Sequence, residues 1–254
     1  MRIGILRTDS VLEGLQPAHG DYPAMFAAVL SDPAALPPAL KGVPPEFVEY
    51  AAHEGELPPP DACDAYLITG SRHSVYDPLP WLPPLVAFLR QALALDRKII
   101  GICFGHQLIA HFFGGETGPA AVGWCVGLQQ NRVKARLPWM SPAVDTFALP
   151  ASHRDQVQRL PEGALRFAST DSCPNAGFVL GDRVLALQCH PEFTRAYAND
   201  LLTVREPVLG ADRVASARTS LDSASDAPLV ARWILNFLAG APSDTGSPVV
   251  SEAT

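Results

Sequence analysis

The stretch Lys98-Ile99-Ile100-Gly101-Ile102-Cys103-Phe104-Gly105 limits the fold of this chain more than any other. Residues 98–102 have the apolar, β-branched composition of a central buried strand, and residues 105–113 have that of a helix. A glycine stands two residues before and two residues after Cys103, which predicts a tight strand-to-helix turn with the cysteine at its tip. Such a turn presents the sulfur at the carboxyl edge of the sheet.

The chain before this turn alternates strands with helices. We expect strands at residues 2–6, 46–50 and 65–69 and helices at residues 22–30 and 81–95. The proline-rich residues 31–45 exclude a regular helix. The alternation predicts an α/β fold with an open, mostly parallel sheet flanked by helices.

The chain after Gly115 has a different pattern, in which short apolar stretches alternate with turn signals. We expect these stretches to be strands that close the fold. Helical spacing returns near residue 196, and after Pro228 one stripe carries Leu229, Trp233, Ile234, Phe237 and Leu238. The sequence therefore predicts an α/β domain at residues 1–195, a helical extension packed on it at 196–240, and a disordered tail at 241–254.

A second motif supplies a base and a carboxylate. Residues 184–188 are an expected strand, and it runs into Cys189-His190-Pro191-Glu192-Phe193. A cysteine nucleophile needs a base within hydrogen-bond reach and a third group that orients the base. The helix that follows Cys103 favours its thiolate, because unpaired N–H groups point at the sulfur. Taken alone, the first motif could simply contain a buried, unreactive cysteine, and the second could contain a histidine at a strand end with no link to Glu192. Together the two motifs favour a catalytic triad of Cys103, His190 and Glu192.

Composition argues against several other classes of function. The 254 residues carry a net charge of −7 and no run of five basic residues, which argues against a nucleic-acid partner. No apolar stretch has the length of a signal sequence or a membrane span, so we expect a cytoplasmic protein without membrane contact. The five cysteines have no framework spacing and should be free thiols. Cys103, His106, Cys189 and His190 lack zinc-ligand spacing, and we expect neither a metal nor a cofactor.

The two motifs resemble those of the class I glutamine amidotransferase family, which are G-x-C-x-G-x-Q and H-P-E. They stand here as Gly-Ile-Cys-Phe-Gly-His-Gln and His-Pro-Glu, in the family's chain order. The resemblance covers roughly residues 1–195 and implies a flavodoxin-like catalytic domain acting on a small γ-glutamyl substrate. In the family's mechanism, Cys103 would be the nucleophile that forms a γ-glutamyl thioester, His190 the base and Glu192 the acid that orients it.

The resemblance extends to backbone donors and substrate contacts. Ile68-Thr69-Gly70-Ser71-Arg72 occupies the place of the family's Gly-Gly-Pro turn, so the N–H groups of Ser71 and Phe104 would form the oxyanion hole. Arg72 replaces the family's proline, and its cation could reach a group beyond the scissile amide. The segment Ser152-His153-Arg154-Asp155 resembles the one that holds the α-amino and α-carboxyl groups of glutamine. The implied contacts of the γ-glutamyl group are Gln107, Arg154 and Asp155.

Three hypotheses for the activity remain. The chain contains no G-x-x-x-x-G-K-[ST] nucleotide loop, whereas the GMP synthetase glutaminase, which it resembles, is fused to an ATP-using domain. Thr69 to Asp77 is more similar to the stand-alone branch related to plant γ-glutamyl peptidases. The first hypothesis is therefore a free-standing hydrolase of glutamine or γ-glutamyl peptides, and the second is a glutaminase subunit that supplies ammonia to a separate synthetase. The third is a non-catalytic scaffold, against which the intact triad argues. The apolar C-terminal helix could also form the interface of a homodimer, so a homodimer is a further possibility.

Overall fold

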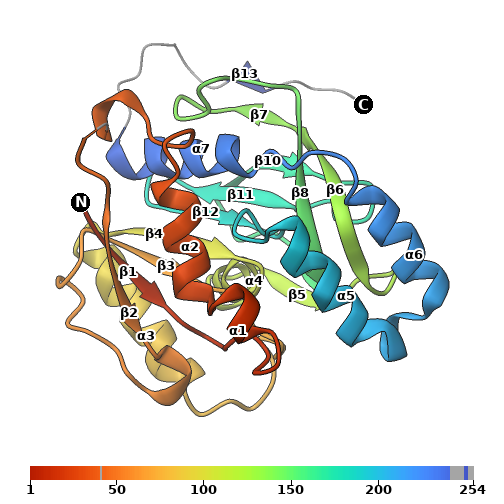
Figure 1. Ribbon diagram of the computed structural model, residues 1–254. Coiled ribbons are helices and arrows are strands. Elements are labelled where there is room, and N and C mark those ends of the chain that lie inside the picture. The colour runs from red at the N-terminus through yellow and green to blue at the C-terminus, as the bar shows by residue number, and fades with distance from the viewer. Residues whose placement is uncertain (41, 241–248, 251–254) are drawn as a thin grey trace.

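A single large sheet organises the protein (Figure 1). The computed structural model describes residues 1–40, 42–240 and 249–250. In spatial order the strands of the sheet are β2 (Glu46–Tyr50), β1 (Arg2–Leu6), β3 (Ala65–Ile68), β4 (Lys98–Ile102), β12 (Val184–Leu187), β11 (Gly177–Leu180), β10 (Ala164–Ser169), β6 (Cys125–Val133) and β8 (Thr146–His153). The first five run parallel, and the other four continue the sheet as antiparallel neighbours. The predicted open α/β sheet is confirmed, and the stretches after Gly115 form its antiparallel part.

Helices cover both faces of this sheet (Figure 1). The helices are α1 (Gln16–His19), α2 (Tyr22–Ser31), α3 (Leu82–Ala94), α4 (Phe104–Phe112), α5 (Arg195–Leu209), α6 (Ala211–Ser220) and α7 (Ala227–Ala239), with short 3-10 turns at η1 (Pro38–Leu40) and η2 (Ala52–Glu54). Phe26 of α2 and Trp233 of α7 belong to the apolar cluster on one face. Leu89 of α3 and Leu108 of α4 belong to the cluster on the other. The strands β3 and β12 lie between these layers, so all of their residues are buried and their sequences are continuously apolar.

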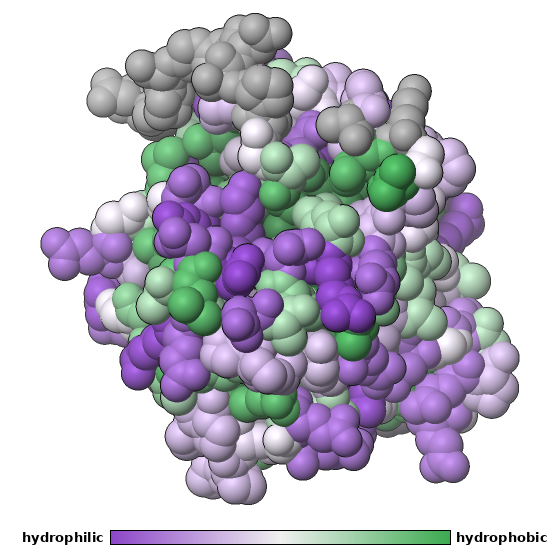
Figure 2. Space-filling model, turned by 90° about the vertical axis from the view of Figure 1, so that its left-hand side faces the viewer, coloured by the Kyte–Doolittle hydropathy of each residue, from purple (hydrophilic) through white to green (hydrophobic). Residues whose placement is uncertain are grey.

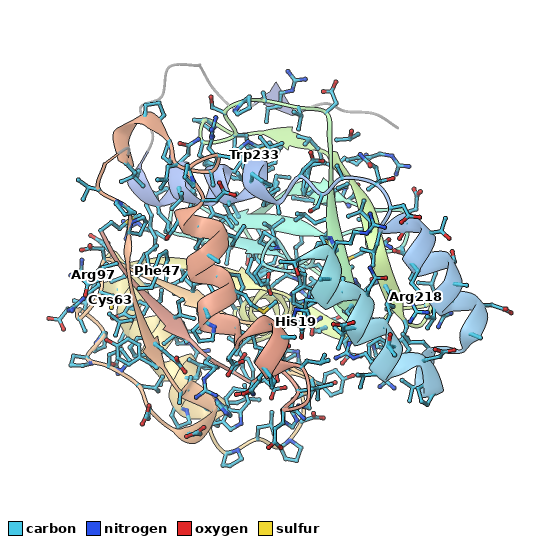
Figure 3. The ribbon with its side chains drawn as sticks, viewed as in Figure 1. His19, Phe47, Cys63, Arg97, Arg218 and Trp233 are labelled. Atoms are coloured by element: carbon cyan, nitrogen blue, oxygen red, sulfur yellow. The ribbon has the colours of Figure 1, made fainter. Side chains whose placement is uncertain are left out.

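The three C-terminal helices pack on the sheet in two places. α7 lies in the main core, where the Trp233 ring contacts the Phe147 ring at a centroid distance of 5.3 Å (Figure 3). α5 and α6 lie beside β6, and Val214 and Ala217 share a smaller apolar cluster with Val126. The expected disordered tail at 241–254 lies outside the described residues except for Val249–Val250. These two residues form β13, which pairs with β7 (Ala135–Arg136), and β5 (Glu116–Pro119) pairs with β9 (Asp155–Arg159).

The surface in Figure 2 mixes hydrophobic and hydrophilic residues, and its hydrophobic groups are interrupted by hydrophilic ones. Among the described residues, the exposed large hydrophobic side chains are Val43, Tyr76, Leu95, Val122, Val204 and Val208. No helix in the described part of the chain combines the length and the apolar character that a membrane span requires.

Candidate active site

Cys103 occupies a strained turn between β4 and α4. Its backbone has φ 52° and ψ −96°, a left-handed conformation that costs free energy for any residue except glycine. The turn is also crowded, because a methyl group on Gly101 would lie 2.6 Å from the Gly105 carbonyl oxygen. A methyl group on Gly105 would lie 2.6 Å from the Ile68 carbonyl oxygen. The two glycines therefore allow β3, β4 and α4 to meet closely, as the sequence pattern predicts.

The turn after β3 lies against the first turn of α4. The Gly105 N–H donates to the Thr69 carbonyl oxygen at 3.3 Å, and the Thr8 hydroxyl donates to the carbonyl oxygens of Thr69 and Gly70 at 3.1 Å each. No described residue accepts a hydrogen bond from the N–H of Ser71 or of Phe104. Two free donors beside the sulfur can stabilise an oxyanion. This arrangement supports the predicted roles of Ser71 and Phe104.

The parallel pairing of β4 and β12 brings the second motif to Cys103. Leu187 pairs with Ile102, so the residues that follow both strands emerge at the same edge of the sheet. His190 Nδ1 lies 2.7 Å from a Glu192 carboxylate oxygen, and both side chains are buried. The Phe193 ring stacks on the imidazole at a centroid distance of 3.8 Å. With Nδ1 held by Glu192, the other ring nitrogen is left for the sulfur.

The charges around His190 favour its protonated form. Burial is the largest effect and opposes the charge, but the Glu192 carboxylate and the Cys103 sulfur outweigh it and raise the pKa of His190 to about 10. A methyl group on Gly70 would lie 3.1 Å from His190 Cε1 and 3.7 Å from Cys103 Cβ, which places the two side chains around one point. At neutral pH His190 therefore carries a proton that it can give to a leaving group.

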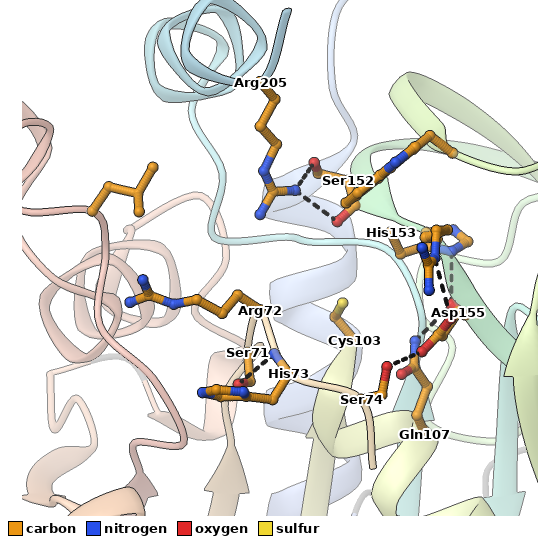
Figure 4. Close-up of a pocket in the computed structure, with 13 residues that line it drawn as sticks. Ser71, Arg72, His73, Ser74, Cys103, Gln107, Ser152, His153, Asp155 and Arg205 are labelled. Carbon is orange, nitrogen blue, oxygen red and sulfur yellow. Dashed lines mark hydrogen bonds and ion pairs between the residues drawn. The ribbon is translucent and has the colours of Figure 1, made fainter. Parts of the chain in front are cut away.

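A cleft of about 470 Å3 opens above Cys103 (Figure 4). Ser71, Arg72, Gln107, Arg154 and Asp155, which the sequence motifs single out, all line it. The structure therefore brings these predicted residues together around the sulfur, although Arg154 lies at the rim with an exposed side chain.

Asp155 offers a fixed carboxylate at one end of the cleft. One carboxylate oxygen accepts hydrogen bonds from the hydroxyl groups of Ser74 and Tyr76, the latter at 2.8 Å. The other oxygen is buried and accepts no hydrogen bond from a described residue, although the Arg154 guanidinium lies 3.8 Å away. A buried carboxylate oxygen with free acceptor capacity suits a substrate ammonium group.

Two glutamines lie beneath the sulfur. Gln107 donates from its amide nitrogen to the Asp155 carbonyl oxygen at 2.7 Å and to the Gln188 side-chain oxygen at 3.2 Å. Gln188, which is completely buried, donates to Cys103 Sγ at 3.6 Å. Gln107 thus connects the nucleophile turn with the segment that carries Asp155. Gln188 was not predicted from the sequence, although its position two residues before His190 was an available signal.

Arg72 is held by a partner that was not predicted from the sequence. Its backbone N–H and two guanidinium nitrogens each donate to the Asp9 carboxylate at 2.8 Å. Burial would raise the pKa of Asp9, but these hydrogen bonds and the guanidinium charge lower it overall, so the carboxylate stays ionised. Asp9 lies three residues after the end of β1, and this position at the carboxyl end of a strand was the signal that could have marked it as a site residue. Asp9 and Arg72 together fix the turn that carries Ser71.

Two further buried histidines near the site, His106 and His153, are neutral at physiological pH. Burial lowers the pKa of His106 to about 3, and both of its ring nitrogens lack a partner among the described residues. Burial likewise lowers the pKa of His153 to about 4, and its Nδ1 lies 3.0 Å from the Asp155 carbonyl oxygen. Within the described residues, no group of three or more His, Cys, Asp and Glu side chains could hold a metal ion.

A family model described as glutamine amidotransferase class-I matches residues 40–203. The chain belongs to this family. Gamma-glutamyl peptidase 3 of Arabidopsis thaliana is 28% identical over 189 residues, which are 71% of this chain and 76% of that protein. A glutamine-hydrolyzing GMP synthase component of Archaeoglobus fulgidus is 37% identical over 103 residues, which are 39% of this chain and 54% of that protein.

The fold agrees with this membership. The crystal structure of a glutamine amidotransferase from Thermotoga maritima matches with a TM-score of 0.72 over 96% of this chain and 98% of that one, at 18% identity. Together with the curated relatives, the family match identifies the protein as an enzyme of the class I glutamine amidotransferase type.

Proposed function

We propose that this protein hydrolyses γ-glutamyl amide bonds, with Cys103 as nucleophile, His190 as base and acid, and Glu192 as the group that orients His190. The observation that carries the proposal is the strained Cys103 turn beside the buried His190–Glu192 pair. The carboxylate of Asp155 and the free N–H groups of Ser71 and Phe104 lie around the same sulfur and complete a site for a γ-glutamyl carbonyl.

In the first step the Cys103 thiolate attacks the γ-carbonyl carbon. A carbon–sulfur bond forms, and the carbonyl oxygen takes the negative charge between the N–H groups of Ser71 and Phe104. When the tetrahedral intermediate collapses, the carbon–nitrogen bond breaks and His190 gives its proton to the leaving nitrogen. Ammonia or an amine departs and a γ-glutamyl thioester remains on the enzyme.

In the second step His190, now neutral, takes a proton from water. The resulting hydroxide attacks the thioester carbon, the carbon–sulfur bond breaks, and glutamate leaves. His190 again carries a proton and Cys103 again carries a negative charge. Glu192 keeps the imidazole oriented through both steps.

The glutamyl group is anchored at the Asp155 end of the cleft. We propose that the free Asp155 oxygen accepts a hydrogen bond from the substrate α-ammonium group, because Ser74 and Tyr76 already hold the other oxygen. Gln107 contributes its side-chain oxygen, since its amide nitrogen is already engaged. Arg154 at the rim would face the substrate α-carboxylate.

A glutaminase that serves a separate synthetase is the second candidate. The match to a GMP synthase component favours it. The two candidates differ in their dependence on a partner. The purified chain alone, without ATP, should hydrolyse a γ-glutamyl peptide faster than glutamine, measured as glutamate release from each substrate. A chain that is inert on every γ-glutamyl compound until a second protein is added would make the synthetase-dependent glutaminase the better assignment.

A diazo-ketone analogue of glutamine should alkylate Cys103 and none of the other cysteines. Burial raises the pKa of Cys63, Cys125, Cys173 and Cys189, in the case of Cys189 to about 12, so these thiols stay protonated and unreactive. Intact mass should show one adduct, and peptide mapping should place it on Cys103. An adduct on Cys189 or Cys125 with Cys103 unmodified would contradict the assignment of the nucleophile.

A further inference from the structure

Arg205 carries a charge that the protein itself does not balance. It extends from α5, and its Nη1 donates to the Ser152 hydroxyl at 2.6 Å and to the Ser152 carbonyl oxygen at 3.4 Å. Its guanidinium carbon lies 5.2 Å from the centroid of the Trp124 ring. Among the described residues, no carboxylate lies within 4.0 Å of it. The guanidinium is thus held in place by neutral groups and keeps its full charge for an anion.

The other two arginines that line the cleft differ in this respect. Arg72 forms an ion pair with Asp9 at 2.8 Å, and Arg154 lies 3.8 Å from a carboxylate oxygen of Asp155. Of these three arginines, Arg205 is therefore the one that has no carboxylate within 4.0 Å in the described part of the cleft.

The position of Arg205 connects it with the leaving group. Arg205 lines the cleft and also a narrow recess beside Cys103 and His190, whereas Gln107 and Asp155 line the cleft only. In Figure 4 Arg205 reaches toward Cys103 from α5, on the opposite side of the sulfur from Gln107 and Asp155. His190 must reach the leaving nitrogen to protonate it, so the leaving group lies at the His190 end.

We propose that Arg205 forms a leaving-group subsite for a carboxylate, so that the preferred substrate is a γ-glutamyl amino acid or peptide with a free carboxylate close to the scissile nitrogen. The inference rests on the proposed function and specifies its substrate class. Arg205 is able to form a charge-assisted pair with the carboxylate of such a leaving group, which is absent from glutamine and from neutral amides. The helical extension thereby contributes a specificity residue to the site.

Two substrates that differ only in this charge test the proposal. γ-Glutamyl-alanine ends in a carboxylate, and γ-glutamyl-alaninamide ends in a neutral amide. The wild-type kcat/KM should be higher for the acid. In Arg205→Gln the ratio of kcat/KM for the acid to that for the amide should fall about 10- to 100-fold, the range expected for a hydrogen bond between charged groups.

Arg218→Gln is the matched control. Arg218 lies on the neighbouring α6 and donates to the Thr203 hydroxyl on the surface at 2.7 Å, so its loss should leave the acid-to-amide ratio unchanged (Figure 3). Arg205→Lys is the second variant, because it keeps the charge while losing the planar fork and should retain part of the preference. Thermal melting of each variant reports whether it folds.

Three outcomes would overturn the proposal. A wild-type enzyme with equal kcat/KM for the acid and the amide has no carboxylate subsite, whatever the variants do. An Arg205→Gln variant that loses activity on both substrates equally would assign Arg205 to the α-carboxylate of the glutamyl group, which both substrates share. A wild-type enzyme that cleaves no γ-glutamyl compound would contradict the proposed function itself. The first two outcomes are distinguishable from this one, because in both of them the wild-type enzyme is active.

Discussion

Replacing Cys103 by alanine should abolish turnover of every γ-glutamyl substrate, by about four orders of magnitude or more, because no other group can form the thioester. The variant should still fold, since the change removes one sulfur atom from a residue that is 5% exposed. Steady-state hydrolysis and a thermal melt measure the two effects. Cys189→Ala is the control, because it removes a neighbouring buried sulfur that the mechanism does not use. If Cys103→Ala turned over substrate at a rate close to that of the wild type, the nucleophile would have to be a different residue.

The other two members of the proposed triad should have graded effects. His190→Asn should approach the Cys103→Ala loss, and Glu192→Gln should retain some activity, because Glu192 acts only through His190. Glu192 raises the pKa of His190, so its neutralisation should lower that pKa. His190 would then lose its proton at lower pH, and the alkaline limb of the kcat/KM profile should move down by about one to three pH units. If the alkaline limb of the Glu192→Gln profile stayed in place, Glu192 would not be the group that sets the pKa of His190.

Ending the chain at Asp226 should prevent folding, whereas ending it at Gly240 should change the melting temperature little, because among the described contacts it removes only the two-residue pairing of β13 with β7. The shorter chain lacks α7, whose Trp233, Ile234 and Leu235 are at most 1% exposed in the main core. Fully burying one large apolar side chain contributes about 1.5–3 kcal/mol, so several such losses approach the whole stability of a domain, about 5–15 kcal/mol. Lys98 of β4 also donates to the Phe237 carbonyl oxygen at 2.5 Å and caps this helix.

A single substitution gives a graded version of this prediction. Trp233→Ala should cost about 3–5 kcal/mol of unfolding free energy. Trp233→Phe should cost less, because it keeps most of the packing and loses the hydrogen bond from the indole N–H to the Pro142 carbonyl oxygen at 3.0 Å. Urea denaturation measures both values. Unchanged stability of Trp233→Ala would show that α7 is not part of the core.

Local sequence patterns determined the elements and the chemistry at the centre of the site. An apolar run, two glycines around Cys103 and the helix after it predict the strained turn, because strand composition, helical spacing and glycine requirements are properties of neighbouring residues. The same reasoning predicts β12 and places His190 and Glu192 directly after it. The apolar stripe of α7 is also a local property, and it correctly marks the face that Trp233 buries.

Only the tertiary structure decided which residues surround that centre. Asp9 holds Arg72 across 63 residues, Tyr76 holds Asp155 across 79, and Arg205 reaches Ser152 across 53. Such pairs form because the order of strands in the sheet and the packing of α5 bring distant segments to one edge. Hydrophobic periodicity does not encode strand order, so the sequence left Arg72 without its partner and Arg205 without a role. The proposed charge preference for the leaving group therefore depends on long-range packing, whereas the proposed nucleophile and its base can be recognised from short motifs.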